Sequence, residues 1–169
     1  MKTRILRFGS LALAVVAIAF AAWFGYAWWH AAHDDGIGRA VVRDDALKAG
    51  QQAVATLTTL DYRQAGPGYQ RWLDASTGAL HDELAADQQG SLDRITQAKT
   101  VTDGKVLDAA VTEVDSGAGT AKVIASVELQ VKPDGGDPVT KRNRFQAELA
   151  RTPAGWRVTA LGQIPVTQS

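Results

Sequence analysis

The stretch that decides the fold class is residues 121–132, AKVIASVELQVK. Small or apolar side chains occupy every second position, and polar or charged ones lie between them, apart from Ile124. A period of two predicts a long β-strand that buries one face and leaves the other wetter. The same alternation predicts strands at residues 144–150 and 156–161 and, less regularly, at 105–114.

Short connectors separate these expected strands. They are rich in Gly, Pro and Asp: DSGAG at 115–119, PDGGDP at 133–138 and TPAG at 152–155. Segments of this length and composition favour hairpin turns, which join antiparallel neighbours. We therefore expect a four-stranded antiparallel sheet in the C-terminal half of the chain.

A helical pattern precedes the strands. Apolar side chains recur at spacings of three and four, which places them on one helix face. These residues are Val42, Ala46, Ala49, Ala53, Leu57 and Leu60. They predict a helix over residues 39–61, and Gly66-Pro67-Gly68 is expected to end any extension of it.

Two further helices are expected before the first strand. A brief one at residues 69–76 contains Trp72. A longer one begins after Thr77, its expected N-cap, and runs to Ala98 with a break at Gly90. Helices followed by strands are typical of an α+β domain. We expect the sheet to curve around the long helix and form a half-open cone.

The N-terminal end differs in character from this domain. Residues 8–29 carry no charge over 22 positions, and a bilayer core needs about 20 apolar residues. Lys2, Arg4 and Arg7 precede the segment, and positive charge stays on the cytoplasmic side of a membrane. The prediction is a single-pass protein of the cell membrane. Its parts are a basic cytoplasmic tip (1–7), a transmembrane helix (8–29), a hinge (30–38) and an extracytoplasmic α+β domain (39–169).

A cleaved signal peptide is the alternative interpretation of this end. It would use the apolar run at 11–20 and the small residues at 19–22 as its cleavage region. The apolar run continues to Trp29, however, and bulky Trp23 and Phe24 follow the candidate site, which favours an uncleaved anchor. Both interpretations place the domain outside the cytoplasm.

Composition disfavours several function classes. The chain balances 18 bases against 18 acids, but three bases precede Phe8 and leave the remainder mildly acidic. A net acidic domain disfavours a nucleic-acid-binding surface. Since the chain has no Cys, it offers no disulfide framework, no thiolate chemistry and no zinc site of the cysteine type.

Few residues could carry chemistry. His30, His33 and Asp34 have a spacing that would allow metal binding, but they lie at the expected membrane exit, where interfacial polarity is the simpler interpretation. His81 with Asp82 could supply acid–base chemistry. Neighbours on a helix, however, point about 100° apart.

The remaining candidates favour structural roles. Asp61 and Tyr62 could line a cavity mouth, although a helix end with a packed Tyr is favoured. Trp72 and Trp156 are expected to anchor the core, with a partner surface as the alternative. No nucleophile, phosphate-loop or dinucleotide motif is present. We predict no catalytic, cofactor-binding or metal-binding residue and a protein that is not an enzyme.

Several local motifs carry a family resemblance. They are LTTLDY at 57–62, the step from Trp72-Leu73 into Ser76-Thr77-Gly78, and GWRV at 155–158. With the basic tip and the span, they resemble the Mce-associated membrane proteins of actinobacteria, small accessory proteins of mammalian-cell-entry lipid transporters. The likeness covers residues 2–166.

The resemblance implies a fold, a role and partners. The fold is a cystatin-like or SnoaL-like cone without catalytic residues. The role is a non-enzymatic scaffold subunit that assembles or stabilises a Mce-type lipid transport complex, with the membrane, Mce-family proteins and their permease as partners. Three alternatives stay open: a module that binds a lipid or sterol in the cone, the scaffold of a secretion channel, and an isomerase or dehydratase of the cone class.

Overall fold

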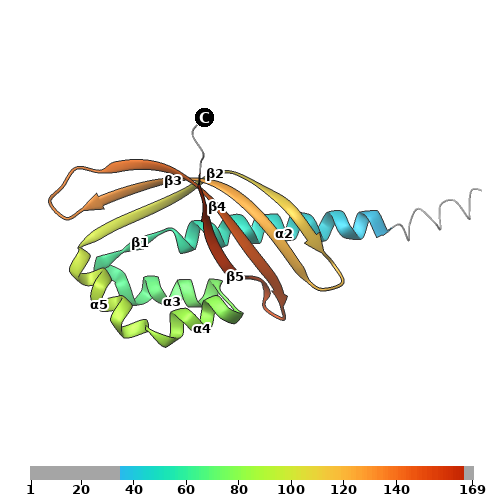
Figure 1. Cartoon of the computed structure of the whole chain (residues 1–169), viewed down its shortest axis with the longest axis horizontal. Helices are drawn as coiled ribbons and strands as arrows, with labels where there is room; N and C mark the ends of the chain where they lie inside the picture. Colours follow the sequence, from blue (N-terminus) through green and yellow to red (C-terminus); the bar gives the residue numbers. More distant parts are fainter. Residues whose placement is uncertain (1–34, 166–169) are drawn as a thin grey trace, which may run out of the picture. The chain divides into compact units, whose positions relative to one another are not determined.

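The computed structural model describes residues 35–165, in which the helices precede the four long strands and one two-residue strand follows the first helix (Figure 1). The compact unit that holds the sheet begins at Ala40. Within 35–165 no helix is long and apolar enough to cross a membrane. The predicted tip (1–7) and transmembrane helix (8–29) lie outside the described residues. The elements are α2 (Asp35–Leu57), β1 (Leu60–Asp61), η1 (Tyr62–Gln64), α3 (Ala65–Ala75), α4 (Gly78–Ala86), α5 (Gln88–Ala98), β2 (Thr100–Asp115), β3 (Thr120–Pro133), β4 (Val139–Thr152) and β5 (Gly155–Ile164).

The sheet confirms the predicted antiparallel meander. Each strand lies beside its neighbour in the sequence, in the order β1-β2-β3-β4-β5. Two register shifts in the β2–β3 pair and one in the β4–β5 pair mark bulges, which bend strands and increase their twist. These bulges account for the curvature of the sheet.

β1 is a fifth strand that the sequence pattern does not reveal. Leu60 pairs with Thr102 of β2, and Leu60 is buried. The prediction of a helix through Asp61 is therefore wrong at its C-terminal end, because α2 stops at Leu57 and Leu60 reaches the core from a strand. At the other end, α2 begins at Asp35 and so extends into the segment predicted as the hinge.

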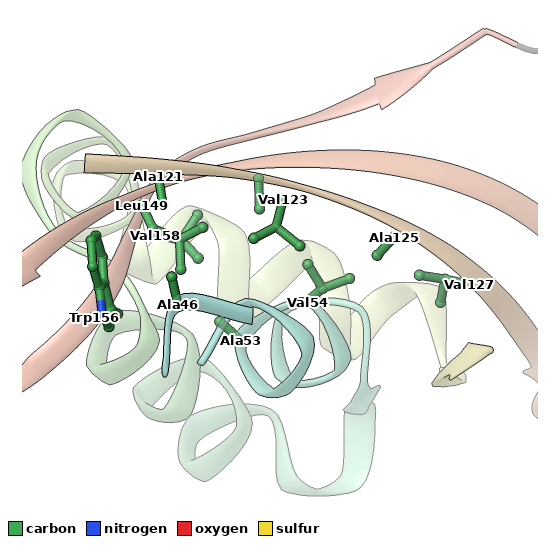
Figure 2. Packing of buried hydrophobic residues seen from close by; sticks show 11 residues of the cluster. Ala46, Ala53, Val54, Ala121, Val123, Ala125, Val127, Leu149, Trp156 and Val158 are labelled. Carbon is green, nitrogen blue, oxygen red and sulfur yellow. The ribbon is translucent and has the colours of Figure 1, made fainter. Parts of the chain in front are cut away.

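The core forms between α2 and the inner face of the sheet (Figure 2). Val54 of α2 and Val123 and Val127 of β3 are all fully buried in it. Gly50 brings the helix close to the sheet, since a Cβ at this position would lie 2.8 Å from Cγ2 of Val123. The interior beneath β3 is thus filled by side chains, and one helix face is kept small to allow the contact.

The outer face of the sheet is polar, as the alternation predicts. Nζ of Lys122 lies 2.7 Å from Oε2 of Glu113 on β2, and Nη2 of Arg142 lies 3.1 Å from Oε2 of Glu128 on β3. Exposed ion pairs of this kind contribute little to stability. These charges keep the outer face hydrated, while the apolar side chains of the strands are buried on the opposite face of the sheet.

The shorter helices differ from their predicted bounds. Pro67 lies in the first turn of α3, where its missing N–H removes no helix hydrogen bond, so Gly66-Pro67-Gly68 begins a helix instead of ending one. Thr77 occupies the N-cap position of α4, but its side chain makes no capping hydrogen bond. The break before α5 falls at Asp87, not at Gly90.

Candidate functional site

The LTTLDY motif forms a tight corner where α2 ends. The Trp72 indole N–H donates to the carbonyl of Thr56 at 2.9 Å and, less closely, to that of Thr59 at 3.3 Å. Tyr69, one turn earlier on α3, packs against the Trp72 ring with centroids 5.6 Å apart. The Thr56 carbonyl lies in the last turn of α2 and also accepts from the Thr59 backbone N–H at 3.2 Å, whereas the Thr59 carbonyl lies just beyond the helix. Trp72 therefore holds the chain where it leaves α2.

The other side of the corner is held by β2. The backbone N–H of Gly104 donates to Oγ1 of Thr59 at 3.0 Å. A Cβ on Gly104 would lie 2.7 Å from Cβ of Thr58 and 3.1 Å from its carbonyl oxygen, so only glycine fits here. We call the region formed by Thr58, Thr59, Trp72 and Gly104 the Trp72 corner. Its residues hold α2, α3 and β2 together.

Asp61 and Tyr62, which the sequence suggests as residues of a cavity mouth, lie where β1 passes into η1. Oδ1 of Asp61 accepts from the backbone N–H of Arg63 at 2.9 Å and from its Nε at 3.0 Å, which lowers the pKa of the Asp61 carboxyl. Desolvation, with the nearby charge of Asp134, raises the pKa of Tyr62. Asp61 caps η1, which is a structural role.

Among the described residues, Asp82 is the one ion-pair partner of His81. The His81 side chain on α4 is 44% exposed, and Nδ1 lies 3.8 Å from Oδ1 of Asp82, whose side chain is 85% exposed. Residues 35–165 contain no group of three acidic or histidine side chains that could hold a metal. His30, His33 and Asp34 lie outside the described residues.

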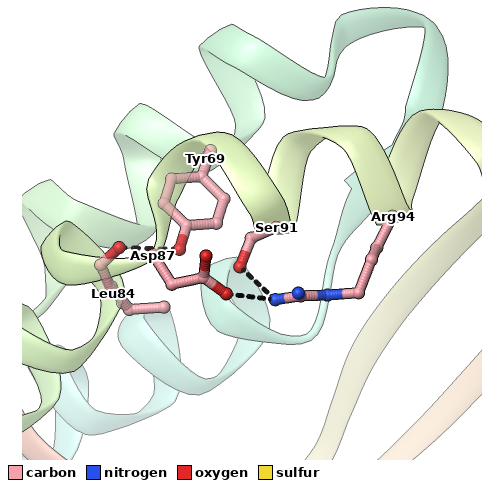
Figure 3. Close-up of polar contacts among 5 residues, drawn as sticks. All are labelled: Tyr69, Leu84, Asp87, Ser91 and Arg94. Carbon is pink, nitrogen blue, oxygen red and sulfur yellow. Dashed lines mark hydrogen bonds and ion pairs between the residues drawn. The ribbon is translucent and has the colours of Figure 1, made fainter.

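A polar cluster links α3, α4 and α5 (Figure 3). The Tyr69 side chain is buried, and its hydroxyl donates to the Leu84 carbonyl at 2.8 Å. Nη2 of Arg94 lies 2.6 Å from Oδ2 of Asp87 and 3.0 Å from Oγ of Ser91. These contacts position the three helices relative to one another.

The sequence does not predict the hollow that lies beside Trp156. Its volume is about 260 Å³, and it opens to solvent between α2, α3 and β5. Trp156 follows Gly155 at the start of β5 and is only 7% exposed. We call this region the Trp156 hollow. Its lining consists of Ala49, Gln52, Ala53, Thr56, Arg71, Asp74, Ala75, Trp156 and Arg157.

Two other hollows are less promising. One of about 600 Å³ is a broad, open groove between α2 and β2, lined by Lys48, Gln51, Gln52, Ala55, Asp103, Gly104, Lys105 and Val106. Another, of about 280 Å³, lies on the sheet and includes the Glu113–Lys122 ion pair. Neither contains a buried aromatic side chain with a free donor.

Comparison with known proteins identifies relatives by sequence. A family model described as "Uncharacterized protein Rv1363c/MT1408-like" matches residues 8–152. The curated protein "Uncharacterized protein Rv1363c" of Mycobacterium tuberculosis is 28% identical over 130 residues. That match covers 75% of this chain and 49% of the relative, so the chain spans about half the length of the curated relative.

Solved structures share the fold. The periplasmic domain of DotI matches with a TM-score of 0.58 and 16% identity, over 71% of this chain and 93% of that domain. An IcmL-like type IV secretion system protein of Legionella pneumophila matches with a TM-score of 0.60 and 12% identity, over 75% and 95% of the two chains. CagV, a VirB8 homolog of Helicobacter pylori, matches at 0.55 with 7% identity, over 73% and 99%. The domain therefore has the curved α+β fold of these proteins.

Proposed function

The chain belongs to the Rv1363c/MT1408-like family, and from this premise we propose that it is a non-enzymatic scaffold subunit of a multi-protein complex in the cell envelope. Residues 8–29 anchor it in the membrane, and the α+β domain lies on the extracytoplasmic side. The domain presents its surfaces to partners in the same membrane, where tethering raises the effective concentration of each for the other.

One observation carries the proposal. The fold matches nearly the full length of the periplasmic domain of DotI and of an IcmL-like type IV secretion system protein. The exposed His81 and the capping role of Asp61 support a role in binding for this domain. Fold alone does not fix function, so partners must be identified directly.

The kind of complex has two candidates. The structural likeness favours the scaffold of a secretion channel, because an IcmL-like type IV secretion system protein and the VirB8 homolog CagV share the fold of this domain. The sequence resemblance to Mce-associated proteins supports a lipid transport complex as the second candidate. A module that encloses a lipid is disfavoured, because Val54, Val123 and the contact at Gly50 fill the space between α2 and β3.

The topology can be tested with single cysteines, since the natural chain has none. Ser116→Cys places a thiol in the exposed turn between β2 and β3, and Thr3→Cys places one in the tip. A membrane-impermeant maleimide should label the first variant in intact cells and the second only after lysis. Labelling of Ser116→Cys only after lysis would place the domain in the cytoplasm and end the proposal.

The partners can be tested by purification from native membranes. The tagged full chain is solubilised in mild detergent after crosslinking, and the proteins recovered with it are identified by mass spectrometry. Secretion-channel subunits would support the first candidate, and Mce-family proteins with a permease the second. Recovery of the chain alone as a monodisperse monomer would contradict both.

A further inference from the structure

The two tryptophans of the domain differ in how their indole N–H groups are used. The Trp72 N–H donates to two carbonyls, whereas the Trp156 N–H has no acceptor within residues 35–165. No buried side-chain nitrogen or oxygen among the described residues lacks a partner, so the Trp156 N–H is reached by solvent. A largely buried Trp usually has a partner for this donor. The ring of Trp156 lines a solvent-open hollow, so an outside group can reach the side chain.

Positive charge surrounds the same hollow. Arg71 of α3 and Arg157 of β5 both line it, and neither forms an ion pair with a described residue. Asp74 is the one acidic residue of the lining, and Gln70 donates to its Oδ1 at 3.1 Å. The lining therefore carries two guanidinium groups against one carboxylate, an excess that favours an anion.

The floor of the hollow is apolar. Ala49 and Ala53 of α2 and Ala75 of α3 leave the space open beside the Trp156 ring, because larger side chains at these positions would occupy it. An aromatic or compact aliphatic body packs well on such a surface. The volume of about 260 Å³ lies just below the range of about 300–1,000 Å³ for drug-sized ligands, which limits the occupant to a small group.

We propose that the Trp156 hollow binds a carboxylate carried on a compact apolar body. The body packs against the Trp156 ring and the alanines, and the carboxylate accepts hydrogen bonds from the Arg71 and Arg157 guanidiniums. Guanidinium groups pair with carboxylates through charge-assisted hydrogen bonds, often two at a time. The site is independent of the scaffold role and would stand if that role were disproved.

The test uses the full chain in detergent, labelled with 5-fluorotryptophan and observed by fluorine NMR. Trp156→Phe identifies the Trp156 signal. Benzoate is the probe; benzamide keeps the ring without the charge, and acetate keeps the charge without the ring. Benzoate should shift the Trp156 signal saturably and leave the Trp72 signal in place, while benzamide and acetate bind several-fold more weakly. A Trp156 signal that benzoate leaves unchanged, or that benzamide shifts equally well, would overturn the proposal.

Matched variants locate the anion-binding groups. Arg71→Gln and Arg157→Gln should each weaken benzoate binding by roughly threefold to tenfold. Lys48→Gln removes an exposed cation that lines the neighbouring groove and should leave the affinity unchanged. Equal affinity in all three variants would contradict the assignment.

A filling variant provides a control that does not depend on charge. Ala75→Leu should occupy the hollow and abolish benzoate binding, with an unchanged circular dichroism spectrum to show that the fold persists. Undiminished binding by the folded variant would exclude the hollow as the binding site.

Acetyl-Gly-Phe, as the free acid and as the amide, distinguishes two sources of the natural carboxylate: the C-terminus of a protein chain and a small organic acid. Tighter binding of the free-acid peptide than of benzoate assigns a chain terminus, and weaker binding assigns a small organic acid.

Discussion

The Trp72 corner and the Trp156 hollow each place a tryptophan beside α2 and α3, yet they are built in opposite ways. In the corner, the indole N–H and the Thr59 hydroxyl have partners, and Gly104 removes all spare space. In the hollow, the indole N–H has no described partner and alanines leave about 260 Å³ open. The difference indicates that Trp72 stabilises the packing of α2 against α3, whereas the Trp156 ring is left as a surface on which a ligand can pack.

The largest effect is expected from the glycine of the corner. Gly104→Ala places a Cβ against the Thr58 side chain and carbonyl, and overpacking of this kind costs about 1–3 kcal/mol. Urea denaturation of the full chain in detergent, followed by circular dichroism, should show this loss. Gly162→Ala on β5 is the control, since a Cβ there meets nothing within 4 Å, and its stability should change by about 0.5 kcal/mol or less. Equal stability of the two variants would show that the corner is not tightly packed.

The second prediction compares the two tryptophans directly. Trp72→Phe removes the indole donor to the Thr56 and Thr59 carbonyls. The Thr56 carbonyl keeps the Thr59 N–H as a donor, but the Thr59 carbonyl loses the indole, and a part-buried group left without its partner costs about 1–3 kcal/mol. Trp156→Phe removes an N–H that has no described partner, so only the packing of the smaller ring is lost. The same denaturation assay should show a larger loss for Trp72→Phe. The reverse order would remove the distinction between the two regions.

The third prediction tests the hydrogen bond between Thr59 and Gly104. Thr59→Val keeps the side-chain shape but leaves the Gly104 N–H without an acceptor, which should cost about 1 kcal/mol. Thr59→Ser restores the hydroxyl and should recover most of the stability. Amide hydrogen exchange at Gly104 should accelerate in the Val variant only. An unchanged exchange rate would mean that the bond does not protect this amide.

The smallest effect concerns pH and Asp61. Its carboxyl has a folded-state pKa below its ordinary value of 3.8, mainly because of the hydrogen bonds from Arg63. A depressed folded-state pKa contributes stability above pH 3.8 that is lost as the pH falls through the folded value. The stability difference between the natural chain and Asp61→Asn should therefore be constant near pH 6 and shrink below pH 3.8. A difference that grows on acidification would contradict the assignment.

Much of the fold could be predicted from periodicity alone. Residues 121–132 alternate because one face of β3 is buried and the other faces solvent, and the turn-rich connectors require antiparallel neighbours. The end of α2 could not be predicted in this way. Leu60 continues the helical spacing, so a local pattern cannot distinguish one more helical turn from a strand that reaches the same core.

The sequence by itself determined the α+β order and the antiparallel meander, because these depend on the order and type of residues along the chain. Only the tertiary structure decided that Gly50 and Gly104 are sites of close approach and that the Trp72 N–H has acceptors while the Trp156 N–H has none within residues 35–165. It also brought together Arg71 and Arg157, which are separated by most of the domain in sequence. Contacts between distant residues depend on how helices and strands pack, and no local pattern encodes that distance.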